Sequence, residues 1–143
     1  MLVAATSAIA LLFGSALTIQ LFVIPQLMAR IQDRSAVTRV SNNILRKHHM
    51  LSVLMLTAAT SLFWLGGKPA AATVTTLLLL LNLYQRFWIF TKLHLVKQPI
   101  GVQDLIQPDN VLREEFNRLQ KNVYSLFRIH LFLLLIDLVL AAF

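Results

Sequence analysis

The chain contains no cysteine among its 143 residues. This absence excludes disulfide bonds, thiolate metal sites and cysteine nucleophiles, and it leaves the cellular compartment open. Charge is also scarce, because charged residues make up only 13% of the chain and the first 29 residues carry no charged side chain. A secretory leader would begin with a basic segment and have a shorter apolar core. The N-terminal stretch is therefore expected to be a retained membrane span.

Recognisable catalytic motifs are missing as well. Serine, histidine and acidic residues do not stand in the spacing of a nucleophile arrangement, and the sequence has no glycine-rich phosphate loop. We therefore assign no catalytic residue, and we expect a non-enzymatic protein.

Apolar residues are abundant, at 57% of the chain. A soluble protein of this size could not bury so much apolar surface, whereas a bilayer solvates it. Four stretches read as membrane spans, at about residues 2–27, 48–65, 70–91 and 124–143. We predict a single integral membrane domain over residues 1–143: an all-α, four-helix transmembrane bundle with a cytoplasmic amphipathic helix before the last span.

The connections between the spans differ in length. The sequence Gly66-Gly67-Lys68-Pro69 is typical of a tight turn, so the second and third spans are predicted to form an antiparallel hairpin. In the first connection, residues 28–47, apolar residues recur at helical spacing: Val37, Val40 and Ile44. This segment is either a helix along the membrane surface or a solvated basic loop with one or two helical turns.

The second long connection, residues 98–121, is predicted to begin irregularly at Gln98 and to continue as a helix. One apolar face of that helix is marked by Leu112, Phe116, Leu119 and Val123. We expect it to run without a break into the last span and to pack on the end of the bundle.

Basic residues set the predicted orientation. The net charge is +7, with five basic residues in segment 28–47, seven from Arg86 to Arg128, and Lys68 alone in the hairpin. The positive-inside rule places both basic connections in the cytoplasm and both termini outside, which suits a bacterial inner membrane. The expected partners are anionic lipids rather than nucleic acid, and the head-group contacts are assigned to Arg30, Arg34, Arg46, Lys47, Lys92 and Lys97.

All four histidines are predicted to lie at a similar depth: His48, His49, His94 and His130. Convergent imidazoles can hold haem iron, copper or zinc, so a bound haem or metal is one hypothesis. His48 and His49 point about 100° apart on a helix, so at most one of them is expected to join such a site. The alternative is that these histidines bond to lipid head groups and backbone carbonyls.

Asp137 lies seven residues after His130, about two helical turns, so both lie on one stripe of the last span. Ionisable groups at membrane depth usually face a bundle interior or a wet cavity. Together with Asn82, Gln85 and Arg86, His130 and Asp137 form a candidate proton path. Alternatively, these polar residues hold neighbouring helices together. If Asp137 is buried, it needs a polar partner. Asn82 is expected to lie closer to it in membrane depth than Arg86, and a hydroxyl group is a further candidate.

Three segments resemble the transmembrane-protein-205-like family of small four-span membrane proteins. The first is IPQLMARIQDRSAVTRVSNNILRKHH, which leaves the first span, and the second contains Asn82 and Tyr84. The third, FRIHLFLLLIDL, is similar to the family's Phe-x-x-His followed seven residues later by Asn, with Asp137 in place of the Asn. The resemblance implies a four-span layout and no established enzymatic activity.

The sequence thus predicts an accessory or scaffolding subunit that packs with other membrane proteins or with further copies of itself. Two alternatives stay open. One is a haem- or quinone-binding membrane anchor of a respiratory or photosynthetic complex, and the other is a small proton-coupled transporter.

Overall fold

The computed structural model describes residues 1–32, 34–103 and 111–142, with the backbone alone for 34–35, 97–103 and 111–113. This part of the chain is helical and contains no strand, which confirms the all-α class. The helices are α1 (Leu2–Thr18), η1 (Ile19–Val23), α2 (Ile24–Arg30), α3 (Arg34–Leu65), α4 (Pro69–Tyr84), η2 (Gln85–Ile89), α5 (Phe90–Gln103) and α6 (Val111–Ala142). Both η1 and η2 are π-helical turns that join the α-helices on either side.

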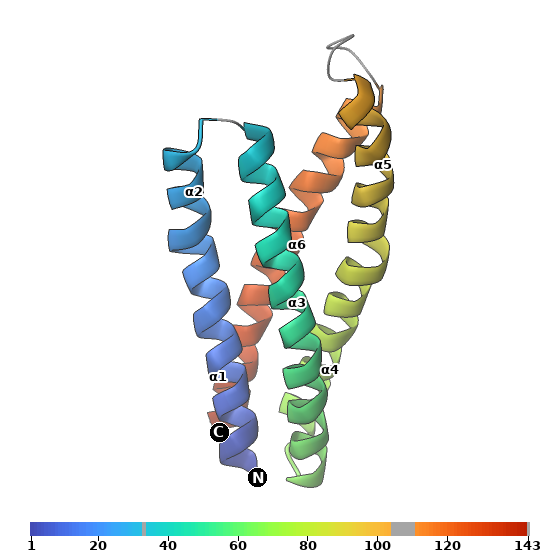
Figure 1. Ribbon diagram of the computed structural model, residues 1–143. Helices are drawn as coiled ribbons and strands as arrows, with labels where there is room; N and C mark the ends of the chain where they lie inside the picture. The colour runs from blue at the N-terminus through green and yellow to red at the C-terminus, as the bar shows by residue number, and fades with distance from the viewer. Residues whose placement is uncertain (33, 104–110, 143) are drawn as a thin grey trace.

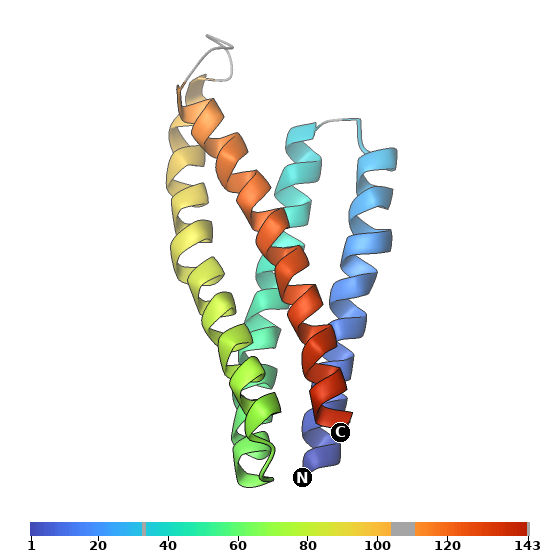
Figure 2. The same ribbon diagram turned by 180° about the vertical axis from the view of Figure 1, so that it is seen from behind.

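The two ends of the bundle differ in what they contain. The start of α1, the end of α6 and the α3–α4 turn share one end, which we call the hairpin end (Figures 1 and 2). The end of α2, the start of α3 and the end of α5 lie at the other, which we call the basic end. The helices diverge toward the basic end, and this divergence decides where grooves can form.

Three helical stretches are long and apolar enough to cross a membrane: Leu2–Arg30, Ala36–Leu65 and Glu114–Ala142. The sequence predicts four spans. The predicted third span falls in α4 and η2, and it is not among these three. Asn82, Gln85 and Arg86 lie within it and lower its hydropathy. The structure therefore supports a membrane protein with three candidate spans.

The basic segments are helical extensions rather than separate connections. The α3 helix already begins at Arg34, so segment 34–47 is neither a loop nor a separate surface helix. Its buried positions are Val37, Ser41 and Leu45, spaced four residues apart, which is the period of one helix face. The irregular start predicted at Gln98 is also wrong, because α5 continues to Gln103.

The last helix behaves as the sequence predicts. The α6 helix is a single helix from Val111 to Ala142. Leu119 and Val123 are buried on the predicted apolar face, and Phe116 is half-buried. The side chain of Leu112 lies outside the described residues.

The turn between α3 and α4 depends on two glycines. Gly67 has φ +70°, a conformation that costs other residues backbone strain. The Lys68 N–H donates to the Phe63 carbonyl at 3.0 Å and the Gly67 N–H to the Trp64 carbonyl at 3.3 Å, the bond pattern of a Schellman cap. Gly66 lies against α1, because a Cβ there would come within 2.5 Å of Leu2 Cδ2.

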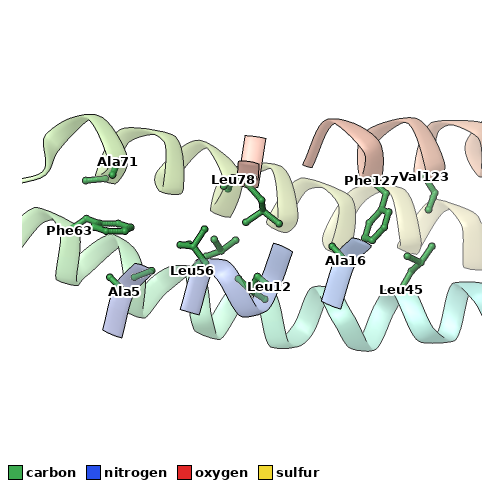
Figure 3. Packing of buried hydrophobic residues seen from close by; sticks show 14 of the residues in the cluster. Ala5, Leu12, Ala16, Leu45, Leu56, Phe63, Ala71, Leu78, Val123 and Phe127 are labelled. Carbon is green, nitrogen blue, oxygen red and sulfur yellow. The ribbon is translucent and has the colours of Figure 1, made fainter. Parts of the chain in front are cut away.

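The interior near the hairpin end is apolar and lined by small residues. Ala5, Ala59, Ala71 and Ala72 are all essentially inaccessible, and Phe63 packs among them (Figure 3). Alanine lets helix backbones approach closely, which is how helices associate within a bilayer. Further toward the basic end, each of the four long helices contributes one buried leucine, and we call this set the leucine layer: Leu12, Leu56, Leu78 and Leu134.

Candidate functional site

Beyond the leucine layer, toward the basic end, the interior becomes polar. His48 and His49 come from α3, Asn82 from α4 and His130 from α6, and all four are buried. We call these residues the histidine cluster. At 1.5 Å per residue, Asn82 lies about 20 Å along its helix from Pro69, and His49 lies about 24 Å from Leu65. The cluster is therefore well inside the bundle.

Asn82 joins the two histidines that face it. Its side-chain oxygen, Oδ1, meets Nδ1 of His49, and its amide nitrogen, Nδ2, lies 3.2 Å from Nδ1 of His130. The same Nδ2 donates to the Leu78 carbonyl at 3.3 Å. Rotating the amide by 180° would set its oxygen against that carbonyl, so the Leu78 contact fixes which way the amide points.

The fixed amide determines where the histidine hydrogens are. Because Oδ1 can only accept, His49 must carry its hydrogen on Nδ1, which leaves Nε2 with a free lone pair. Because Nδ2 donates to His130, the neutral His130 ring carries its hydrogen on Nε2. Both Nε2 atoms are buried and have no hydrogen-bond partner among the described residues, and the same is true of the amide oxygen and nitrogen of Gln85. The cluster thus contains unmatched donors and acceptors.

His48 ties α3 to α1 instead. Its Nε2 lies 3.1 Å from the hydroxyl of Ser15, and its Nδ1 lies 3.3 Å from the hydroxyl of Ser52. Both histidines of the adjacent pair lie in the interior, and that at most one of them joins a metal or haem site stays a prediction. Each faces a different neighbouring helix, and both are buried.

Phe127 fills the space between the imidazoles. Its ring centroid lies 5.7 Å from that of His48 and 6.1 Å from that of His49, in both cases edge to face. It stacks on His130 at 6.5 Å with an interplanar angle of 20°. Sequence reasoning missed Phe127 as a site residue. Its position three residues before His130, hence on the same helix face, is the signal that could have identified it.

His94 lies apart from the other three histidines. It is exposed on α5 and lines a groove with Arg46 and Arg86 rather than the buried interior. Within the described part of the chain, no three His, Cys, Asp or Glu side chains are close enough to hold a metal ion. Of the four histidines predicted to lie at a similar depth, the structure thus brings His48, His49 and His130 together in the interior and leaves His94 outside it.

The partner of Asp137 is not Asn82, which its expected membrane depth had favoured. It is buried near the hairpin end, where its Oδ2 lies 2.7 Å from the hydroxyl of Thr75, and its Oδ1 has no partner. Asn82 contacts the histidines instead. Thr75 precedes Asn82 by seven residues, about 10 Å along α4, and the leucine layer lies between these levels. Asp137 and the histidine cluster are thus two separate polar sites.

The remaining predicted residues lie toward the basic end. Gln85 is buried on η2, and Arg86 is half-exposed with its guanidinium carbon 5.9 Å from the Phe87 ring centroid. The basic side chains predicted to contact head groups are exposed where the structure describes them: Arg30, Arg46, Lys47 and Lys92. The side chains of Arg34 and Lys97 lie outside the described residues.

Comparison of the chain with protein-family models, with curated proteins and with solved structures finds no match.

Proposed function

We propose that the chain crosses the membrane four times, with the basic end in the cytoplasm and the hairpin end outside, in a bacterial inner membrane. Two exposed tryptophans support the crossing of α4 and η2. Trp64 lies at the hairpin end and Trp88 lies 19 residues after Pro69, or about 28 Å along the helix. Tryptophan favours both membrane interfaces, and roughly 30 Å is the thickness of the hydrocarbon core between them.

Within that membrane, the proposed function is that of a non-enzymatic accessory or scaffolding subunit. The observation that supports this function is that the buried polar side chains form hydrogen bonds between different helices. Asn82 joins α3, α4 and α6, the Ser15–His48 contact joins α1 and α3, and the Thr75–Asp137 contact joins α4 and α6. Such contacts specify how membrane helices pair.

The face offered to a partner is on α1. Ala10, Gly14 and Thr18 are exposed at four-residue spacing, the small-xxx-small pattern of close helix contacts. A Cβ on Gly14 would meet nothing within 4 Å, so the packing of this chain gives no reason for a glycine inside a helix. The Thr18 hydroxyl donates to the Gly14 carbonyl at 2.8 Å, which leaves its methyl group to pack outward. The proposed occupant is a transmembrane helix of another subunit.

Native mass spectrometry of complexes extracted in mild detergent tests this function. The expected result is a stoichiometric partner subunit that is lost in Gly14→Leu and kept in Leu80→Ala, a control at an exposed position on α4. Gly14→Leu should leave the isolated bundle folded, because the added side chain meets open space. Extraction of the wild type as a partnerless monomer would contradict the proposal.

A second candidate is the haem- or quinone-binding anchor. What favours it is the set of unpartnered groups in the histidine cluster. The His49 lone pair is the kind of group that ligates haem iron, whereas the His130 N–H and the Gln85 amide could donate to a quinone carbonyl. A Soret band abolished by His49→Ala, or a quinone recovered by solvent extraction and lost in Gln85→Leu, would establish it. Colourless protein with no extractable quinone would exclude it.

Kinship with the transmembrane-protein-205-like family remains a proposal. What supports it is that two of the resembling segments meet, since Asn82 of the second contacts His130 of the third. Aligned relatives in which Asn and His vary together at these positions would strengthen it, and independent variation would argue against it.

A further inference from the structure

The α3 helix and the η2–α5 segment diverge toward the basic end (Figure 1), and two cavities lie between them. One cavity of about 340 Å³ is lined by Arg46, Arg86, Phe87, Phe90, Thr91 and His94. A neighbouring cavity of about 180 Å³ is lined by Arg39, Asn42, Asn43, Arg46, Phe90, Leu93 and His94. Because the two share Arg46, Phe90 and His94, they form one continuous depression, which we call the α3–α5 groove.

The groove is built from one stripe of each helix. On α3, the lining positions 39, 42, 43 and 46 recur once per turn. On the facing segment, positions 86, 90 and 94 do the same. The polar groups therefore face each other across the groove instead of scattering around the helices. This arrangement distinguishes them from Lys47 and Lys92, which are exposed nearby but line neither cavity.

The charge of the groove is of one sign. Arg39, Arg46 and Arg86 line it, and none of its lining residues in the described part of the chain is acidic. Like charges that converge without an acidic neighbour repel one another, and a bound anion removes that repulsion. The planar guanidinium group of arginine matches the oxygens of a phosphate group, and the Asn43 amide and the Thr91 hydroxyl add neutral donors.

The level of the groove relative to the membrane indicates which kind of molecule carries the phosphate. Trp88 is exposed beside it and marks the membrane interface, with the Lys92 ammonium 4.7 Å from its ring centroid on the next turn toward the basic end. Phe87 is 67% exposed on the lipid-facing side of the same segment. A ligand held by the arginines would thus sit at head-group level with an apolar surface beside it.

From these observations we infer that the α3–α5 groove binds the phosphate head group of one anionic phospholipid. Arg46 and Arg86 hold its phosphate oxygens from opposite helices, Arg39 adds charge, and the acyl chains run along Phe87 toward the hydrocarbon core. This inference stands apart from the accessory role, because it concerns a different face of the bundle from the Gly14 stripe.

The test is native mass spectrometry of the full chain in mild detergent, titrated with phosphatidylglycerol or, as the zwitterionic comparison, phosphatidylcholine. The wild type should bind one phosphatidylglycerol in preference to phosphatidylcholine. Arg46→Gln/Arg86→Gln should weaken that binding about tenfold or more, since each arginine makes charge-assisted hydrogen bonds to the phosphate. The matched control Arg118→Gln/Lys121→Gln removes the same charge from two exposed side chains on α6 outside the groove and should change binding less than about twofold.

Further variants separate the explanations. Arg39→Gln/Arg46→Gln changes only exposed side chains, so it tests the groove even if loss of Arg86 disturbs the fold. Arg46→Lys/Arg86→Lys keeps the charge without the planar guanidinium group and should bind at an intermediate level. Equal weakening by the groove pair and the control pair, or no weakening by either groove pair, would overturn the proposal. Displacement of the lipid by glycerol 3-phosphate or inorganic phosphate would assign the groove to a soluble phosphate and overturn its lipid identity.

Discussion

The hairpin half and the basic half of this bundle are built from the same long helices but are held together differently. Toward the hairpin end, alanines and Phe63 let the helices approach closely, and one carboxylate oxygen of Asp137 is bonded to Thr75. Toward the basic end, the helices diverge, the interior contains three imidazoles, and a basic groove opens on the outside. The contrast indicates that the hairpin half supplies the close packing, while the basic half holds the histidine cluster and the basic groove, where binding chemistry is to be sought.

The largest expected effect compares one phenylalanine from each half. Phe63→Ala and Phe127→Ala should each lower the free energy of unfolding in detergent by about 3–5 kcal/mol, because both side chains are fully buried. Only Phe127→Ala should also shift the histidine ring signals in nitrogen NMR, because Phe127 contacts three imidazoles. Unchanged histidine signals in Phe127→Ala would contradict its place in the cluster.

The next largest expected effect compares the stability lost when a polar contact is removed from each half. Asn82→Leu should destabilise the bundle by about 2–4 kcal/mol, because it leaves ring nitrogens of His49 and His130 buried without partners. Thr75→Val should cost about 1 kcal/mol, because it removes a single interhelical hydrogen bond. Denaturant unfolding measures both, with exposed Thr73→Val as the control. Equal losses for Asn82→Leu and Thr75→Val would contradict the joining role of Asn82.

Replacing Gly67 or Gly14 by alanine should change the free energy of unfolding by similar amounts but in opposite directions. Gly67→Ala should destabilise the bundle by about 1 kcal/mol, because alanine is strained at φ +70° in the α3–α4 turn. Gly14→Ala should stabilise the isolated chain by about 0.5–1 kcal/mol, because it raises helix propensity and meets open space. Thermal unfolding compares the two variants, and a loss of stability in Gly14→Ala would show that Gly14 packs within its own bundle.

The smallest expected effect is at Asp137. The Thr75 hydroxyl has one hydrogen but lies 2.7 Å from both the Ala71 carbonyl and Asp137 Oδ2. Asp137→Asn supplies an N–H that can donate to the Thr75 hydroxyl oxygen, and the hydroxyl hydrogen then stays with the Ala71 carbonyl. This variant should therefore change the free energy of unfolding by less than about 1 kcal/mol. Asp137→Leu, which supplies no polar group, is the comparison and should cost more. A larger loss in Asp137→Asn than in Asp137→Leu would show that the carboxyl group itself is required.

The sequence predicts the helical class and the hairpin well, for identifiable physical reasons. The long apolar runs allow only helices in a membrane, and Gly66-Gly67-Lys68-Pro69 allows only a turn. The helical extension at 34–47 was harder to predict, because its buried face includes the polar Ser41 while Val40 is 38% exposed. The apolar residues therefore mark a face different from the one that packs.

The burial of His130 and Asp137 was predictable, but the contacts of the site and some of its members were not. The seven-residue spacing correctly placed His130 and Asp137 on one buried stripe. It could not show that Asn82 would bond to two histidines from other helices, because relative helix depth and rotation depend on packing. For the same reason, Thr75 was foreseen for Asp137 only as an unspecified hydroxyl, and Phe127 was missed.

The most direct test of the membrane arrangement uses the absence of cysteine, since a single introduced cysteine can be labelled alone. Ala70→Cys near the hairpin end and Asn117→Cys on α6 toward the basic end both replace exposed, uncharged residues, so the charges that set orientation stay unchanged. With a thiol reagent that cannot cross membranes, intact cells should label Ala70→Cys, and Asn117→Cys should react only after the membrane is opened. Labelling of both from the same side would contradict the four-span bundle with a cytoplasmic basic end.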